Sequence, residues 1–384
     1  MSYKKHFSRF LNAAPERLHF AAHSHHPWPD VTFDAHQQAW LDAARLADQK
    51  WDRVFGEVIP EAQTHVARVL NLPDPRTLVF APSTHELLMR LLSAIERKPL
   101  RVLTTDGEFH SFARQLKRLE EAGAAHAVRV AVEPFASFPA RLCEAIAASS
   151  ADLIYFSQCF YNTGYRLADL AAPVRAAPAG VPLVIDGYHG YMAAPTDLSA
   201  LADRVFYLAG GYKYAMCGEG ACFMHCPPAF AERPLNTGWF ASFGTLTTPQ
   251  GGTVPYAGGG QRFMGATFDP TPLYRLNAVQ NWLARSGITV ATIRAHVEAL
   301  QQQFLATVAK ERLLPGAVLM PPLEVPRGNF LIFRHEQAPA WHRKLLLKDV
   351  QTDLRADRLR IGFGLYQDAD DVEELVRRLS KLRA

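Results

Sequence analysis

Short apolar runs alternate with helix-like stretches between residues 77 and 230. The run at 77–80 has the length of a strand, and residues 86–95 repeat their apolar positions with the period of about 3.6 residues that marks an amphipathic helix. The alternation continues with strand-length runs and one more helical stretch, at 100–103, 113–122, 153–156, 183–185 and 205–208. Repeated strand–helix units predict an α/β fold whose mostly parallel sheet is covered on both faces.

The pattern changes after residue 244. Residues 244–260 are rich in Gly, Thr and Pro and predict a long loop, which a helix at 272–285 follows. A polar helix then leads into a smaller C-terminal α+β domain, whose expected elements are a helix at 290–310, strands at 329–333 and 358–363, and a helix at 370–381. The first turn of the last helix is acidic and its last turn basic, as the helix dipole favours.

The composition is that of an ordinary globular protein large enough for more than one domain. The chain has 384 residues, of which 48% are hydrophobic and 20% charged. Its net charge of +4 comes from scattered basic residues, which argues against nucleic-acid binding and suits an anionic cofactor or a small substrate. Because no apolar stretch is long enough for a membrane span or a signal-peptide core, we expect neither.

The cysteines indicate a cytoplasmic protein. Their odd number and wide spacing, without a Cys-x-x-Cys pair, do not fit a disulfide framework. Three of them, Cys217, Cys222 and Cys226, are close enough in sequence to suggest metal ligands. Cys222, however, lies within an apolar strand-like run, which favours buried structural thiols and no metal site.

The main candidate chemistry lies at the ends of two neighbouring core strands. Lys213 follows the run 205–208 after small residues, and Asp186 ends the apolar run 181–185. Ligands of parallel α/β sheets bind beyond the carboxyl ends of the strands. A lysine and a carboxylate there are what pyridoxal 5'-phosphate (PLP) requires, since the amine forms a Schiff base and the carboxylate keeps the pyridine nitrogen protonated. The sequence thus predicts a PLP site with Lys213 and Asp186 as catalytic residues; a surface lysine on a Gly-rich turn is the alternative.

Further cofactor contacts are expected at the ends of the other strands. Ser83 and Thr84 stand between a strand and a helix, where they can bind the phosphate, although ordinary helix capping explains them equally well. Phe109 is our choice for the ring that stacks on the pyridine, with His110 second. The remaining candidates are Ser157 as a hydrogen-bond donor, His189 for the ring hydroxyl or phosphate, and Tyr212 for the phosphate.

Arg360 is the candidate for binding the substrate. It lies in a predicted strand of the small domain, and a guanidinium there can clamp a substrate carboxylate through two parallel hydrogen bonds. Arg358 alternates with it on the same face of the strand. The expected partner is therefore a small amino-acid substrate rather than a macromolecule.

Five motifs together resemble the class V aminotransferase group of fold-type-I PLP enzymes, and kynureninases in particular. They are Phe156-Ser157 with Thr163-Gly164, Asp186-x-x-His189, Tyr212-Lys213-Tyr214, Gly238-Trp239-Phe240, and Arg360-Ile361-x-x-x-Leu365-Tyr366. The resemblance implies a large PLP-binding domain at 46–285 with a seven-stranded type of sheet. It also implies a small domain at 286–384 and an N-terminal segment at 1–45 that packs on the small domain and the active site. Finally, it implies a homodimer with shared active sites, in which Trp239 and Thr267 reach the cofactor of the partner subunit.

The N-terminal segment departs from this resemblance. Kynureninases carry Gly-Asn-Ser-Leu-Gly in the substrate pocket, whereas the comparable place here reads Ala-His-Ser-His-His-Pro-Trp at 22–28. The resemblance therefore covers the cofactor site, whereas the part of the pocket that would bind the aryl group of the substrate differs. We expect the histidines, His25 among them, to line the substrate entrance.

Several functions remain open from the sequence. The leading hypothesis is kynureninase-like hydrolysis of a β,γ carbon–carbon bond that releases alanine, and the alternative within PLP chemistry is an aminotransferase. Cysteine desulfurase is disfavoured because no cysteine lies in a plainly mobile loop with a reactive setting. Two distant alternatives are a PLP-fold protein without activity and a metal-dependent hydrolase that uses His23, His25 and His26.

Overall fold

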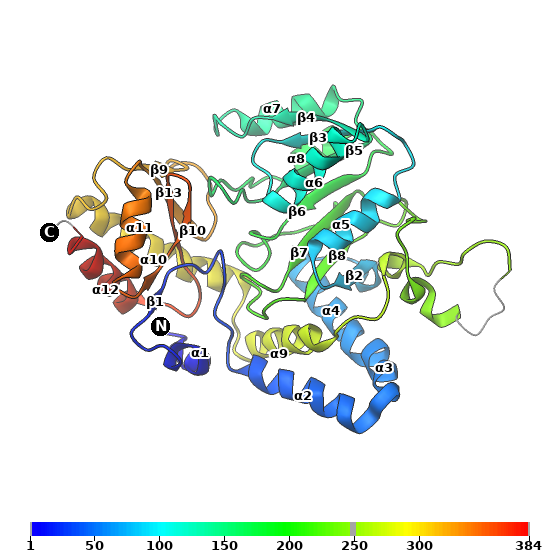
Figure 1. Cartoon of the computed structure of the whole chain (residues 1–384), viewed down its shortest axis with the longest axis horizontal. Helices are drawn as coiled ribbons and strands as arrows, with labels where there is room; N and C mark the ends of the chain where they lie inside the picture. Colours follow the sequence, from blue (N-terminus) through cyan, green and yellow to red (C-terminus); the bar gives the residue numbers. More distant parts are fainter. Residues whose placement is uncertain (1, 246–250, 383–384) are drawn as a thin grey trace.

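The computed structural model describes residues 2–245 and 251–382, which form two lobes (Figure 1). The larger lobe contains a seven-stranded sheet in the order β2-β8-β7-β6-β5-β3-β4. Only β8 runs antiparallel to its neighbours, and the other pairs are parallel. The strands are β2 (Leu78–Ala81), β3 (Leu100–Thr105), β4 (Ala125–Val130), β5 (Leu153–Ser157), β6 (Leu183–Asp186), β7 (Val205–Gly210) and β8 (Cys222–His225).

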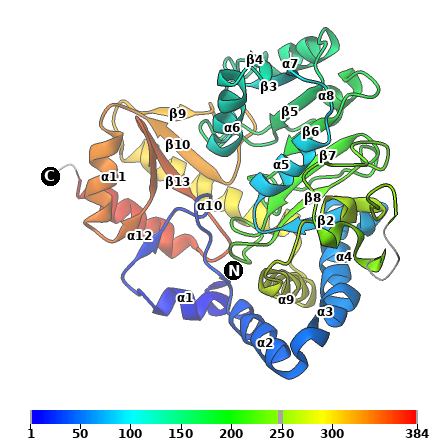
Figure 2. The same cartoon turned by 45° about the vertical axis from the view of Figure 1, so that its right-hand side comes forward.

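Helices cover this sheet and extend the lobe. The helix α5 packs on β2, β7 and β8, while α6 and α7 contact the edge strand β4. Figure 2 shows α9 end-on beside α2 and α4, both of which it contacts. The helices of this lobe are α2 (Val31–Leu46), α3 (Lys50–Arg53), α4 (Ile59–Leu70), α5 (Thr84–Ser93), α6 (His110–Glu121), α7 (Phe138–Ala147), α8 (Ala171–Ala176) and α9 (Thr271–Arg285).

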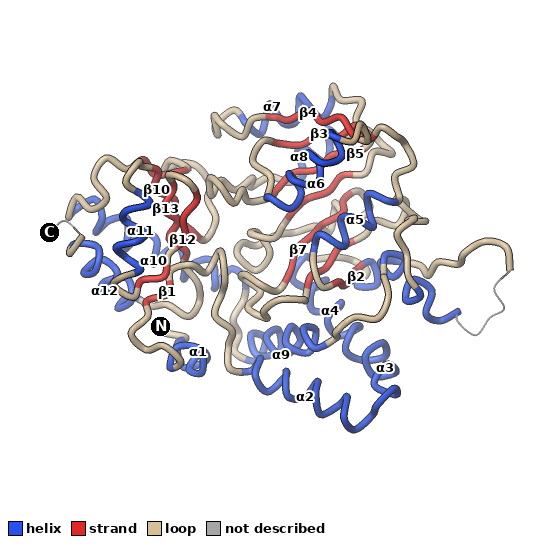
Figure 3. The backbone as a smooth tube through the Cα atoms, in the orientation of Figure 1, coloured by secondary structure: helices blue, strands red, loops and turns tan. Residues whose placement is uncertain are grey.

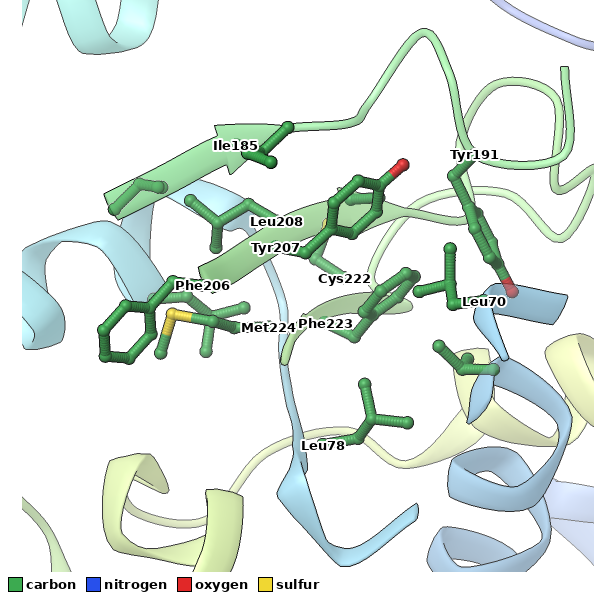
Figure 4. Packing of buried hydrophobic residues seen from close by; sticks show 14 of the residues in the cluster. Leu70, Leu78, Ile185, Tyr191, Phe206, Tyr207, Leu208, Cys222, Phe223 and Met224 are labelled. Atoms are coloured by element: carbon green, nitrogen blue, oxygen red, sulfur yellow. The ribbon is translucent and has the colours of Figure 1, made fainter. Parts of the chain in front are cut away.

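The centre of the sheet is buried on both faces. Every residue of β7 and β8 is buried, and Figure 4 shows aromatic and aliphatic side chains of both strands packed against Leu70 and Tyr191. Strands covered on both faces have continuous apolar runs instead of alternating ones, which is why the pattern at 205–208 is so strong. This core fixes the strand ends that carry the candidate chemistry.

The smaller lobe has its own sheet and its own core. Its antiparallel strands have the order β12-β13-β10-β9, and Figure 3 shows this sheet apart from the larger one. A separate hydrophobic cluster, which includes Phe304, Leu331 and Leu375, fills the space between sheet and helices. The elements are α10 (Val290–Lys310), β9 (Val318–Met320), β10 (Phe330–Arg334), α11 (Ala338–Leu346), β11 (Val350–Gln351), β12 (Asp353–Arg355), β13 (Arg358–Gly362) and α12 (Ala369–Ser380).

The N-terminal segment joins the smaller lobe and then crosses to the larger one. After α1 (Ser8–Asn12), the strand β1 (Leu18–His19) pairs in parallel with β11, and Ala21 bridges Gly362. Residues 22–28 then lead toward α2, which packs on α9. Within the described residues, none of the helices combines the length and apolarity needed to cross a membrane.

The sequence predictions locate about half of the helices and strands. The expected helix at 290–310 has the bounds of α10, whereas α6 begins earlier than predicted, at His110. The sequence analysis did not predict β4, α7 and α8 of the larger lobe. It also did not predict the helices before β2, the helix α11, or the short strands β1, β9, β11 and β12. In the expected loop at 244–260, residues 246–250 lie outside the described part, and the short helix η6 (Gly259–Phe263) forms at its end.

Candidate active site

The sheet brings three candidate residues to one edge. Ser157 ends β5 and pairs in register with Asp186, which ends β6 and pairs with Leu208 of β7. Lys213 follows β7 in a turn that begins at Gly211, between Tyr212 and Tyr214. The edge also includes the start of α5, because β2 and β7 pair through Ala81 and Gly210 with the same residue of β8, Cys222.

The amine of Lys213 is buried in this edge. The residue is 8% exposed, and its Nζ lies 2.7 Å from Nε2 of His189. It also lies 5.3 Å from the ring centroid of Phe109 and 4.9 Å from that of Tyr188. Burial lowers the pKa of Lys213 from 10.5 to about 7, although the charge of Asp186 opposes the change. A substantial fraction of the amine is therefore neutral and nucleophilic at neutral pH.

Asp186 is held by two hydrogen bonds. Its carboxylate accepts one from the Tyr155 hydroxyl at 3.0 Å and one from the backbone N–H of Tyr188 at 3.0 Å. Burial raises the pKa of Asp186, while these hydrogen bonds and the charge of Lys213 act in the opposite direction. The carboxylate is thus fixed in position at a site where it would pair well with a cationic group.

His189 is neutral and contacts the amine directly. Burial, followed by the charge of Lys213, holds the pKa of His189 well below its usual range. Its ring also lies 5.6 Å from that of Phe330, which belongs to the smaller lobe. His189 therefore lies where the two lobes meet.

Glu108 is a buried carboxyl that the sequence analysis did not assign. Its oxygens accept hydrogen bonds from the Thr105 hydroxyl at 2.6 Å, the Ser157 hydroxyl at 2.6 Å and the Ser157 N–H at 3.1 Å. Burial raises the pKa of Glu108 to about 8, against the effect of these hydrogen bonds. The hydroxyl of Ser157, predicted to donate to a cofactor, is engaged by Glu108. In the sequence, only the position of Glu108 directly before Phe109 points to this role.

The predicted phosphate contacts lie near the start of α5. The Ser83 hydroxyl accepts from Glu86 N–H at 3.2 Å and caps the helix, and Thr84 is its first residue. The backbone is closely packed beside them, since a Cβ on Gly210 would lie 2.6 Å from the Cys222 sulfur. The capping alternative therefore holds for the Ser83 side chain, while the helix N-terminus retains its affinity for anions.

Tyr212 and His25 meet at the outer side of the site. Their rings contact edge to face with centroids 5.4 Å apart, and both residues are partly exposed. His25 also lines a cavity of about 600 Å³ between the N-terminal segment and the smaller lobe, together with Arg17, Asp353 and Arg355. The role of His25 at a substrate entrance stays a prediction.

Trp239 and Thr267 lie on the surface of the larger lobe. Trp239 is 43% exposed, and its ring lies 4.2 Å from that of Phe240, at a tilt of 35°, in the short helix η5 (Trp239–Thr245). Thr267 is exposed. Their contact with the cofactor of a second subunit stays a prediction.

Arg360 is buried and already paired. It is 3% exposed, its Nη2 forms an ion pair with Asp353, and its Nη1 donates to the Tyr161 carbonyl at 2.7 Å. Burial alone would raise the pKa of Asp353, but the contacts with His23 and Arg360 hold it below its usual range. The sequence analysis did not predict a role for Asp353. It lies directly opposite Arg360 in the pairing of β12 with β13, so only a prediction of this strand pairing would have identified it.

The three histidines of the N-terminal segment have different surroundings. His23 stacks on Phe330, His25 contacts Tyr212, and the Nδ1 of His26 bonds to the Pro27 carbonyl at 2.7 Å. Among residues 2–245 and 251–382, no group of three His, Cys, Asp or Glu side chains is arranged to hold a metal ion. The three histidines thus contact three different groups.

Comparisons with known proteins agree with this architecture. The family model of the kynureninase C-terminal domain matches residues 293–379. A probable cysteine desulfurase of Vibrio cholerae is 21% identical over 340 residues, which cover 83% of this chain and 81% of that protein.

Solved structures of similar shape cover nearly the whole chain. A cystine C–S lyase in complex with cysteine persulfide superposes with a TM-score of 0.83 at 17% identity, covering 96% of this chain and 99% of that chain. The apo cysteine desulfurase of Thermococcus onnurineus NA1 gives 0.81 at 14% identity, with 100% and 98% covered. These likenesses establish the fold: the chain has the α/β architecture of cysteine desulfurases, which is fold type I of PLP enzymes.

Proposed function

We propose that this chain is a PLP-dependent enzyme of the class V group that acts on an α-amino acid, with Lys213 as the residue that binds the cofactor covalently. The observation that carries the proposal is the buried Lys213 amine, with a pKa of about 7, beside the fixed carboxylate of Asp186. A variant of the cystine C–S lyase with the same fold has glycine covalently linked to its PLP. The fold and the residues at the strand ends thus support one chemistry.

The residues present fit the chemical groups of PLP. Lys213 offers an amine to the aldehyde, Asp186 an anion to the ring nitrogen, and Phe109 a flat face to the ring. The N-terminus of α5 and the Tyr212 hydroxyl suit the phosphate. When bound, PLP supplies an aldehyde that condenses with amines and a ring that accepts an electron pair.

The remaining chemistry belongs to side chains of this chain. A neutral Lys213 can take the proton from the α-carbon of the substrate, because its pKa lies near the working pH. His189, 2.7 Å from the amine, keeps Nζ directed into the site. Arg360 orients the substrate by its carboxylate, which fixes the bond that breaks.

The family-model match supports kynureninase-like hydrolysis as the reaction. The matched stretch, 293–379, contains Arg360 and the neighbouring strand residue Asp353. In this reaction water cleaves a β,γ carbon–carbon bond and alanine is released. We keep this as the leading proposal, with transamination as the alternative.

A second candidate is cleavage of a carbon–sulfur bond, favoured by the similarity to a cystine C–S lyase and to desulfurases. None of the five cysteines is in a position to take sulfur from a substrate at the site. Four are buried, and the partly exposed Cys143 lies in α7 beside α8 and the edge strand β4. Burial also raises the pKa of Cys159, which follows the end of β5 and interacts electrostatically with Lys213, to about 12. This favours a lyase that needs no cysteine nucleophile over a cysteine-dependent desulfurase.

The proposed assembly is a homodimer with shared sites. The exposed Trp239 and Thr267 suit contacts with a second copy, as in the resemblance from which they were predicted. Light scattering combined with Trp239→Ala would test this. A monomeric protein with full activity would exclude shared sites.

A product assay tests the function. The PLP-loaded protein is incubated separately with kynurenine, hydroxykynurenine, cystine and cysteine. Alanine with an aromatic acid supports the hydrolase, pyruvate with ammonia supports the lyase, and a keto acid in stoichiometric amount supports the aminotransferase. A protein that takes up no PLP contradicts all three.

A further inference from the structure

His23 has an unusual setting for a buried histidine. It is 1% exposed and stacks on Phe330 with ring centroids 4.6 Å apart and planes at 19°. The Nδ1 edge of the ring lies against Gly362, since a Cβ added to that glycine would lie 2.1 Å from Nδ1. The ring is therefore locked in one orientation, with Nδ1 closed off by the backbone.

Neither ring nitrogen of His23 has a hydrogen-bond partner among the described residues. Nε2 lies 3.6 Å from Oδ2 of Asp353, which is within ion-pair distance but longer than a hydrogen bond. Folding leaves few buried polar groups without a partner, because each loses its bonds to water. An unpartnered Nε2 next to an active-site arginine is thus a position where a ligand atom is expected.

Arg360 also retains free donors at this place. Of the five N–H groups of a guanidinium, the structure accounts for bonds from Nη1 to Tyr161 and from Nη2 to Asp353. Its Nε is buried and has no partner within the described chain. Two side chains that contact Asp353, His23 of the N-terminal segment and Arg360 of β13, therefore each keep a buried nitrogen without a hydrogen-bond partner among the described residues.

Asp353 itself is fixed. Its Oδ1 accepts from the Leu354 N–H at 2.6 Å and from Arg355 at 3.1 Å, while Oδ2 faces Arg360 and His23. Asp353 already neutralises the charge of the Arg360 guanidinium. The binding of a substrate carboxylate at this place therefore depends less on charge attraction and more on the number of hydrogen-bond donors.

We propose that His23 is a second residue of the substrate-carboxylate subsite, donating from Nε2 beside Arg360. Asp353 is the positioning residue that holds the guanidinium and orients the imidazole. This inference rests on the proposed function and specifies its substrates: they are amino acids with a free α-carboxylate, and the corresponding carboxamides bind poorly.

Calorimetry on the PLP-loaded protein tests the inference with L-alanine and L-alaninamide as probes. His23→Phe keeps a flat ring on Phe330 but removes the N–H. Since a hydrogen bond to a charged group is involved, we expect the Kd of L-alanine to rise about 10- to 100-fold. The Kd of L-alaninamide and the visible absorption band of the cofactor should not change. His23→Gln, whose amide nitrogen reaches the place of Nε2, should recover part of the loss.

The control is His335→Phe, because His335 also stacks on an aromatic ring, Trp341, at 19° but lies outside the site. If His23→Phe unfolds, the smaller His23→Leu is measured instead, since it cannot overfill the space against Gly362. Unchanged discrimination between the two probes in a coloured His23 variant overturns the inference and leaves the proposed function intact. A wild-type protein that takes up no PLP overturns both.

Discussion

Replacing Lys213 by methionine should stabilise the cofactor-free protein, and more so at low pH. Methionine keeps the length and much of the volume of the side chain but carries no charge. In the structure the amine is buried, and its pKa falls from 10.5 to about 7. The folded state therefore resists protonation of Lys213, whereas the unfolded state does not.

The size and sign of the effect follow from these two pKa values. Each pKa unit corresponds to about 1.4 kcal/mol, so full protonation of Lys213 costs the folded state about 5 kcal/mol relative to the unfolded chain. Between pH 7 and 10.5 the unfolded chain holds more protons on this residue, and wild-type stability therefore rises with pH. About half of the total effect lies between pH 6 and pH 9.

Urea unfolding of cofactor-free protein at pH 6 and pH 9 measures this directly. The advantage of Lys213→Met over wild type should shrink by about 2–3 kcal/mol from the lower to the higher pH. Lys117→Met, at an exposed lysine of α6, serves as the control and should show no such change. An advantage of equal size at both pH values would refute the reasoning, because the amine would then titrate like an exposed lysine.

Three other substitutions test separate parts of the site. Asp186→Asn should weaken PLP binding in equilibrium dialysis and abolish turnover, since an amide cannot pair with a charged ring nitrogen; full activity would exclude Asp186 from that role. The stability of Glu108→Gln in urea, relative to wild type, should increase as pH rises from 4.5 to 8. Folding raises the pKa of Glu108 to about 8, so the folded wild type keeps a proton that the unfolded chain loses over this range. A stability difference between the two proteins that does not vary with pH would show an ionised Glu108. Gly187→Ala should lose about 1–3 kcal/mol of stability, as overpacking does. Its Cβ would lie 2.0 Å from the Tyr207 ring, and a Tm equal to that of wild type would mean that the ring moves aside freely.

The predictable part of the fold is the part with strong local patterns. The helix α10 has a helical period along its whole length and an N-cap at Thr289, so its bounds were predictable. The strand β4 lies at the sheet edge with exposed and buried residues mixed, which leaves no clear apolar run. The antiparallel direction of β8 is set by pairing with β2 and β7 and leaves no mark on its own sequence.

The residues of the site also differ in how well local sequence patterns predict them. The proximity of Lys213 and Asp186 follows from strand ends that local patterns identify. His23 and Glu108 differ from exposed residues of their type only through burial by distant segments, such as Phe330 against His23. The pairing of Arg360 with Asp353 likewise depends on the register of β12 and β13.

The central claim is that Lys213 binds PLP covalently. Loading the protein with PLP, reducing it with borohydride and mapping the peptides by mass spectrometry tests this most directly. The account predicts that the cofactor mass is found on the peptide that contains Lys213. Labelling confined to other lysines, or no labelling at all, would contradict it.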